Sequence, residues 1–141
     1  MRGAREEPRG EHLTRRVLLI DDDAGFAGGI SAYLTECGHA VETVSSGFEA
    51  LAALGRGHPD VILLDLHVPG IKGVQVLRHI RQADSTIPIY IVTGSPNGAL
   101  AVEALRNGAA GYVPKPMKLE YLNHLVGLAA QARRGDRTIQ Q

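Results

Sequence analysis

The sequence predicts an α/β fold, in which helices cover both faces of a parallel sheet, from three observations. Short apolar runs alternate five times with segments of helical periodicity, and the connections between them are short. The run Val61–Leu64 is apolar at every position, which is typical of a strand that is buried on both faces. Right-handed crossovers between parallel strands then favour a doubly wound, three-layer sandwich.

Each element follows from a local pattern. The predicted strands are apolar or β-branched runs at residues 17–20, 39–44, 60–64, 88–92 and 109–113. The predicted helices have apolar residues at helical spacing over residues 26–34, 48–54, 74–80, 100–105 and 119–129. Asp23 is a candidate N-cap of the first helix, and Ser45 or Ser46 is a candidate N-cap of the second. Glycine or proline lies at most of the boundaries between elements.

Composition restricts the class of protein. The chain has 141 residues, which suits a single domain. Its basic and acidic side chains balance to a net charge of zero, so composition gives no sign of broad attraction to nucleic acid or anionic membrane. Cys37 is the only cysteine, which excludes an internal disulfide and fits a reducing compartment. Because neither a signal peptide nor about 18 successive apolar residues occurs, we expect a soluble, cytoplasmic protein.

The chain divides into three predicted parts. Residues 1–14 are rich in glycine, proline and charge, and we expect a disordered leader there. Residues 15–132 contain all the predicted strands and helices and form the globular domain. Residues 133–141 are polar, and we expect a frayed tail.

Polar side chains follow the predicted strands at the points where the strands end. Asp21 and Asp22 follow the first strand, Asp65 the third, Thr93 the fourth and Lys115 the fifth. The carboxyl ends of parallel strands meet at one edge of a sheet, where open α/β sheets bind ligands. Each residue alone has an ordinary interpretation as a turn residue, a helix cap or a solvated lysine. Their combination in this order indicates one functional site.

The residue types at this edge indicate phosphoryl transfer. Three carboxylates in one cleft repel one another unless a cation joins them, and their oxygens suit Mg²⁺. Lys115 adds a positive charge, and Thr93 adds a hydroxyl group. Carboxylates serve as phosphoryl acceptors, and positioning and electrostatics dominate such transfers. The site is therefore expected to stabilise a phosphoryl group on Asp65.

From about residue 15 to residue 132 the sequence resembles a known family, the receiver domain of two-component response regulators within the CheY-like superfamily. The matching motifs are Val17–Asp23, Asp60–Asp65, Pro69–Gly70, Ile91–Gly94 and Gly111–Pro116. The resemblance implies a flavodoxin-like fold with five parallel strands in the order 2-1-3-4-5. It also implies that residues 15–132 are a receiver domain.

The resemblance assigns residues to a Mg²⁺ site. It implies that Asp65 is the phosphoacceptor and a metal ligand. Asp22 would bind Mg²⁺ directly, and Asp21 mainly through water. The backbone carbonyl of His67 would be a further ligand.

The resemblance also assigns a switch. It implies that the Thr93 hydroxyl moves onto the phosphoryl oxygens, that Lys115 contacts the phosphoryl group, and that Tyr112 is an aromatic switch. The Lys115–Pro116 peptide bond is expected to be cis, as it usually is in the family.

His67 departs from the family, whose members more often have Met or Asn at this position. This position and that of Ser95, two residues after Thr93, tune phosphorylation and dephosphorylation rates in the family. Our hypothesis is that the His67 imidazole lines the site and alters the lifetime of the phosphoryl group. The alternative is an exposed histidine without a function.

We therefore expect a signalling switch rather than an enzyme, although it would assist its own phosphorylation and the hydrolysis of its aspartyl phosphate. The expected donor is a sensor histidine kinase or a histidine phosphotransfer protein. We expect the face of the fourth helix, fifth strand and fifth helix to bind an output protein or to form a homodimer. We expect no direct binding of nucleic acid or membrane. The chain would be a stand-alone receiver or a fragment of a longer regulator.

Three alternatives differ in class. A degenerate receiver would act as a phosphate-independent interaction module, although the acidic residues are intact here. A phosphatase with an aspartyl nucleophile is disfavoured, because such enzymes need an acid two residues after the nucleophile, where this chain has His67. A flavodoxin-like electron carrier is disfavoured because Asp21–Asp23 would repel the flavin phosphate.

Overall fold

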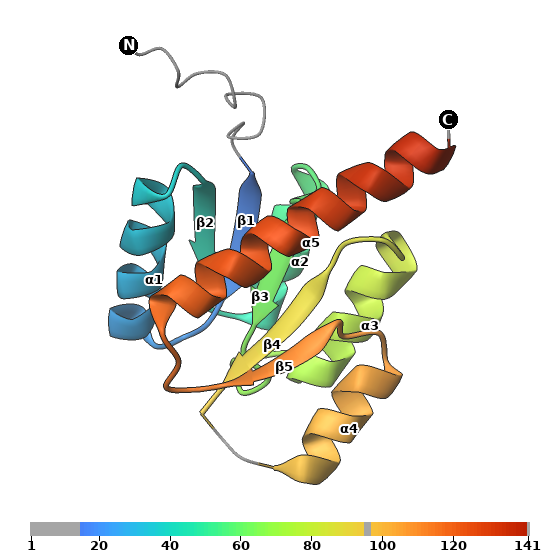
Figure 1. Ribbon diagram of the computed structural model, residues 1–141. Coiled ribbons are helices and arrows are strands. Elements are labelled where there is room, and N and C mark those ends of the chain that lie inside the picture. Colours follow the sequence, from blue (N-terminus) through green and yellow to red (C-terminus); the bar gives the residue numbers. More distant parts are fainter. Residues whose placement is uncertain (1–14, 95–96, 141) are drawn as a thin grey trace.

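The strands and helices occur in the predicted order. A computed structural model describes residues 15–94 and 97–140 (Figure 1). The predicted leader, residues 1–14, lies outside the described residues. The strands are β1 (Arg16–Ile20), β2 (Ala40–Val44), β3 (Val61–Leu64), β4 (Ile89–Thr93) and β5 (Gly111–Pro114). The helices are α1 (Ala24–Glu36), α2 (Gly47–Gly55), α3 (Gly73–Ala83), α4 (Gly98–Arg106) and α5 (Leu119–Gln140).

The five strands form one parallel sheet in the order β2-β1-β3-β4-β5, which confirms the predicted doubly wound topology. β3 is the central strand, and all its residues are buried. Its register places Ile62 beside Leu18 of β1 and Ile89 of β4. β2 lies at an edge, and Val44 is its one buried residue. A continuous apolar run thus corresponds to a central strand, and a mixed run to an edge strand.

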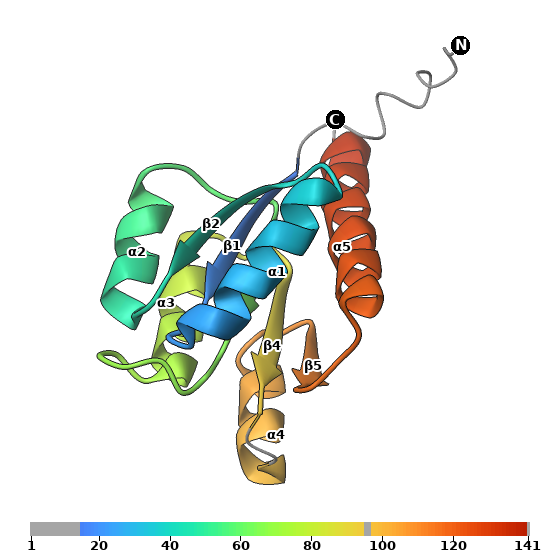
Figure 2. The ribbon, with the colours of Figure 1, turned by 90° about the vertical axis from the view of Figure 1, so that its left-hand side faces the viewer.

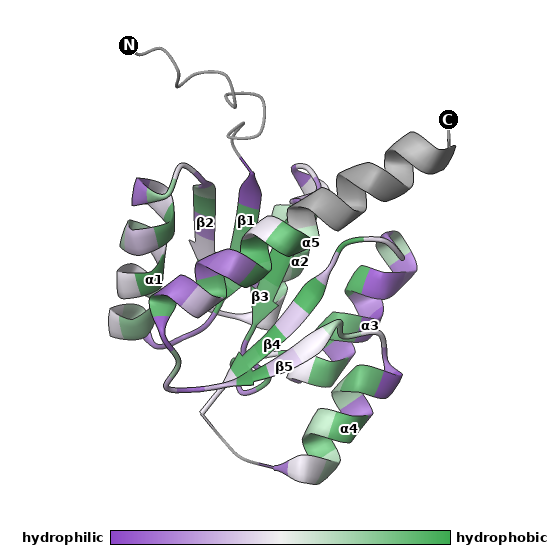
Figure 3. Ribbon diagram, in the orientation of Figure 1, coloured by the Kyte–Doolittle hydropathy of each residue, from purple (hydrophilic) through white to green (hydrophobic). Residues whose placement is uncertain are grey.

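Alternate residues of the strands face two separate parts of the core. Leu18 and Ile20 of β1 pack in a cluster with buried side chains of α2, α3 and α4. Val17 and Leu19 of the same strand pack in a cluster with buried side chains of α1 and α5. Figure 2 shows α2 and α3 on the opposite side of the sheet from α5, and Figure 3 shows the hydrophobic colour on β3 and on parts of β1 and β4, between the helices. The sheet is therefore buried on both faces, as the three-layer architecture requires.

Hydrogen bonds at two helix starts settle how the helices are capped. Asp23 caps α1, as predicted, because its Oδ1 accepts a hydrogen bond from the Phe26 N–H at 3.0 Å. Ser46 rather than Ser45 caps α2, and its hydroxyl accepts from the Glu49 N–H at 3.1 Å. The Ser45 N–H instead donates to Oε1 of Glu49 at 2.9 Å. The two serines thus share Glu49 in a variant of the capping box.

Most element boundaries differ from the predicted ranges by a few residues, and the differences at β5 and α5 have physical reasons. β5 begins at Gly111 instead of residue 109, because the Ala109 N–H donates to the Ala104 carbonyl at the end of α4. α5 continues to Gln140, past residue 132, where a frayed tail was expected. The apolar spacing of this helix stops at Ala129, but an existing helix gains one hydrogen bond with each further residue.

Within the described ranges, no helix combines the length and apolar character needed to cross a membrane.

Candidate functional site

Backbone hydrogen bonds that continue the sheet place three site residues at one edge. The Asp21 N–H donates to the last carbonyl of β2 at 3.0 Å, and the Asp65 N–H donates to the last carbonyl of β1 at 2.9 Å. The Lys115 N–H donates to the carbonyl of Thr93, the last residue of β4, at 2.9 Å. Each of the three donors is the first residue beyond its own strand. The parallel ladder itself therefore brings these distant parts of the chain together.

Asp21 and Asp65 are buried, with 3% and 7% of their surface exposed, and both oxygens of each carboxylate accept hydrogen bonds. Oδ1 of Asp21 accepts from the Asp23 N–H, and Oδ1 of Asp65 accepts from the His67 N–H, both at 2.9 Å. The Lys115 ammonium donates to Oδ2 of Asp21 at 2.8 Å and to Oδ2 of Asp65 at 3.2 Å. The buried carboxylates are thus both paired and hydrogen-bonded, which offsets the free-energy cost of removing them from water.

The ammonium of Lys115 is charged at neutral pH. Partial burial acts to lower the pKa of Lys115, but hydrogen bonds and the negative charges of Asp21 and Asp65 outweigh burial, and the pKa is raised. A fixed positive charge therefore lies where a phosphoryl group on Asp65 would add negative charge.

A divalent cation fits the carboxylates at this edge. Oxygens of Asp21, Asp22 and Asp65 lie within 4.8 Å of one another. Three carboxylates against the Lys115 ammonium leave two negative charges unbalanced. Asp22 is exposed, and Asp21 and Asp22 help to line a hollow of about 470 Å³ between α1, β2 and α2. Mg²⁺ prefers oxygen ligands, uses few carboxylates and keeps waters, so this donor set suits it.

Thr93 and Tyr112 lie on the last two strands. Thr93 is 1% exposed and pairs with Pro114, the residue before Lys115. Tyr112 packs against the core cluster between the sheet and α2, α3 and α4. Together with Gly98, at the start of α4, it helps to line a surface hollow. Thr93 is therefore next to the lysine of the site, and Tyr112 lies towards α4. Their switch roles stay predictions. The Lys115–Pro116 bond is cis, as predicted.

His67 contacts the site through its backbone, and its side chain is exposed. The residue helps to line a hollow of about 600 Å³ formed by the β3–α3 loop, α3 and α4. The roles expected for its imidazole and for its carbonyl stay predictions. Ser95, the second position expected to tune the phosphoryl lifetime, lies outside the described residues.

Sequence reasoning missed one neighbour of Lys115. The ammonium lies 3.9 Å from the centroid of the Phe26 ring, on the first turn of α1. Helical spacing identified Phe26 only as an apolar residue of the first helix. The strand-end argument that joined Asp21 and Lys115 does not extend to a residue inside a helix, so only the folded structure reveals this contact.

Known proteins are similar to this chain in sequence and in fold. The sequence model of the family described as "Response regulator receiver domain" matches residues 17–127. The chain is 36% identical over 124 residues to the DNA-binding response regulator MtrA of Mycolicibacterium paratuberculosis, with 88% of this chain and 54% of that protein covered. It is 38% identical over 121 residues to the transcriptional regulatory protein AfsQ1 of Streptomyces coelicolor, with 86% and 52% covered. The signal receiver domain of a putative Luxo repressor protein from Vibrio parahaemolyticus superposes with a TM-score of 0.84 at 28% identity, with 92% of this chain and 99% of that one covered.

These relatives correct the prediction about partners. The chain spans about half the length of the curated relatives it matches. One is named a DNA-binding response regulator and the other a transcriptional regulatory protein. The prediction excluded nucleic acid and assigned the output to protein contacts on α4, β5 and α5. It was wrong because it relied on the zero net charge of 141 residues, which does not report on the other half of such a regulator.

Proposed function

The chain belongs to the response regulator receiver domain family of two-component systems, and from this we propose that it is a switch operated by phosphorylation of Asp65. The arrangement around Asp65 carries the proposal. Its buried carboxylate lies at the carboxyl end of the central strand, beside two further carboxylates and 3.2 Å from the Lys115 ammonium. Such a set combines an acceptor, a place for a cation and a fixed positive charge.

In the proposed reaction, a carboxylate oxygen of Asp65 attacks the phosphorus of a phosphohistidine on a histidine kinase or phosphotransfer protein. The oxygen–phosphorus bond forms while the phosphorus–nitrogen bond breaks, and the leaving imidazole keeps that electron pair and takes up a proton. Lys115 stabilises the negative charge on the phosphoryl oxygens. In the later hydrolysis, a water oxygen bonds to phosphorus, and the Asp65 oxygen leaves with the electron pair of the broken bond. This restores the carboxylate.

Asp21, Asp22 and Asp65 would hold Mg²⁺, with the carbonyl of His67 as a further ligand. When bound, the ion neutralises charge between the carboxylates and the phosphoryl group. The Thr93 hydroxyl then binds the phosphoryl oxygens, and Tyr112 changes its position with it.

We further propose that the output of the switch is control of DNA binding in a transcription regulator. The names of the relatives support this, since they describe a DNA-binding response regulator and a transcriptional regulatory protein. Phosphorylation can change the DNA affinity only to the extent that it stabilises one conformation of the receiver more than another.

Intact mass spectrometry after incubation with a small phosphodonor tests the proposed chemistry. We expect one phosphoryl adduct that forms with Mg²⁺ and is absent when a chelator removes the metal. A folded protein that forms no adduct and binds no beryllofluoride would contradict the proposal. That result would favour a phosphate-independent interaction module.

Lys115→Met is expected to tighten Mg²⁺ binding by about tenfold at low ionic strength. The ammonium holds oxygens of Asp21 and Asp65 and repels a second cation, so its removal favours the metal. Isothermal titration calorimetry of the variant and the unmodified protein measures the difference. Lys118→Met is the control, because Lys118 is exposed and the variant has the same net charge. Equal affinities in both variants would contradict the prediction.

His67→Met is expected to slow hydrolysis of the aspartyl phosphate by about threefold, well below the effect of a full general base. The imidazole has ring nitrogens that can hydrogen-bond and orient a water molecule near the site, whereas the thioether of methionine is only a weak acceptor. Loss of the phosphoryl group is followed by intact mass after the donor is removed. His79→Met is the control, since His79 is also exposed and its Nδ1 contacts the Gln75 carbonyl within α3. An unchanged rate in His67→Met would end the hypothesis.

A further inference from the structure

Lys115 is held on two different sides. Its ammonium donates to Oδ2 of Asp21 and of Asp65, at 2.8 and 3.2 Å. It also lies over the face of the Phe26 ring, 3.9 Å from the ring centroid. An ammonium at this distance from an aromatic face is attracted by the negative charge of the π system. The two carboxylates and the ring together therefore define where the charge is placed.

The ring and the carboxylates differ in how they respond to phosphorylation. A phosphoryl group on Asp65 converts one carboxylate partner of Lys115 into an acyl phosphate, and a bound cation would compete for the oxygens of Asp21. The contact with Phe26 involves neither change, because the ring is neutral and binds no metal. A lysine side chain has four rotatable bonds and loses much of its freedom when it is held in one place. The ring can thus hold the ammonium while its carboxylate partners change.

The position of the ring is itself set by the acidic loop of the site. The Phe26 N–H donates to Oδ1 of Asp23 at 3.0 Å, and the Ala27 N–H donates to the Asp23 carbonyl at 2.9 Å. The Asp23 N–H in turn donates to Oδ1 of Asp21. The Phe26 side chain is half-buried and packs against the core cluster of α1 and α5. One short segment therefore carries two of the three carboxylates of the site, those of Asp21 and Asp22, and also the ring that faces its lysine.

We propose that Phe26 is a positioning residue of the phosphorylation site, which holds the Lys115 ammonium against the phosphoryl group. The inference rests on the proposed function, because it concerns the same site. It assigns Phe26 an effect on phosphoryl binding that acts through Lys115 alone. An aromatic residue at position 26 is then needed for its π face and not only for its apolar volume.

Five variants test this inference. Phe26→Leu removes the ring and keeps an apolar side chain, whereas Phe26→Trp keeps a stronger π face. Phe48→Leu is the matched control, because Phe48 is the other phenylalanine, is 66% exposed on α2 and packs beside Gly70. Lys115→Met alone, and combined with Phe26→Leu, completes a double-mutant cycle. The readouts are the phosphorylation rate by intact mass and the beryllofluoride affinity by ¹⁹F NMR, both with saturating Mg²⁺.

We expect Phe26→Leu to lower the phosphorylation rate and the beryllofluoride affinity by about threefold to tenfold, the range of a partly desolvated cation–π contact. Phe26→Trp should restore both, Phe48→Leu should change neither, and Phe26→Leu should have no effect once Lys115 is methionine. Equal losses in the Leu and Trp variants would show a packing effect and overturn the inference. A Phe26→Leu protein that behaves like the unmodified protein would overturn the inference and leave the proposed function standing. An unmodified protein that neither accepts phosphate nor binds beryllofluoride would overturn both.

Discussion

Asp65→Asn is expected to abolish the phosphoryl adduct completely. Asparagine keeps the shape of the side chain and an acceptor oxygen for the His67 N–H, but its neutral amide cannot attack phosphorus as a carboxylate does. The adduct is measured by intact mass over time, with Mg²⁺ and a small phosphodonor. Urea unfolding of the same sample shows that the variant is folded, so that loss of the adduct reports on chemistry.

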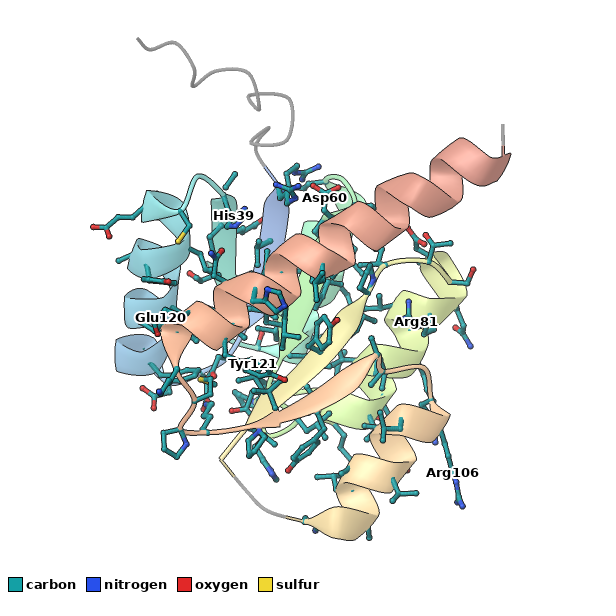
Figure 4. The ribbon with its side chains drawn as sticks, in the orientation of Figure 1. His39, Asp60, Arg81, Arg106, Glu120 and Tyr121 are labelled. Atoms are coloured by element: carbon teal, nitrogen blue, oxygen red, sulfur yellow. The ribbon has the colours of Figure 1, made fainter. Side chains whose placement is uncertain are left out.

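Asp60→Asn is the matched control for this experiment. Asp60 comes directly before β3, whereas Asp65 comes directly after it. Figure 4 shows Asp60 at the edge of the sheet where β1 begins, and its Oδ2 accepts the Arg16 N–H at 2.8 Å. We expect a full adduct in this variant. An adduct that persists at the unmodified rate in Asp65→Asn would mean that another residue accepts the phosphoryl group.

The location of the site could be predicted because it depends on topology and not on side-chain detail. A continuous apolar run identified β3 as a buried central strand, and the residue after it had to lie at the carboxyl edge. The same reasoning applies to Asp21 after β1 and Lys115 after β5, and hydrogen bonds join these side chains in the structure. A ladder of parallel strands leaves little freedom in where its ends lie. The strand order and the position of these side chains at the sheet edge therefore follow from the apolar pattern of the strands and from their order in the sequence.

Contacts that depend on the path of a loop or on the direction of a side chain could not be predicted in this way. Phe26 had the spacing of an ordinary core residue, and its position against Lys115 depends on how the Asp23 cap orients α1. The backbone of His67 contacts Asp65 while its side chain is exposed, a difference that residue type alone does not reveal. After Ala129, apolar residues no longer recur at helical spacing, so the sequence did not predict that α5 continues to Gln140. Each of these requires the three-dimensional arrangement of several elements.

The loop after Asp65 contains a further contact of this kind, and we expect it to make Gly73→Ala strongly destabilising. A Cβ atom at Gly73 would lie 2.4 Å from Cα of Leu66 and 2.5 Å from its carbonyl oxygen. These are backbone atoms of the residue next to Asp65, and they cannot rotate away as a flexible side chain can. Overpacking costs about 1–3 kcal/mol, so we expect the free energy of unfolding to fall by about 3 kcal/mol. Urea denaturation measures the change.

Gly29→Ala separates this steric effect from helix propensity. Gly29 lies inside α1, and a Cβ atom there would have no neighbour within 4 Å. Alanine favours a helix interior over glycine by about 1 kcal/mol, so this variant is expected to gain stability. The same chemical change should therefore have opposite signs at the two positions. A neutral or stabilising Gly73→Ala variant would contradict this prediction. It would mean that the β3–α3 loop is not packed as closely against Gly73 of α3 as the short distances to Leu66 indicate.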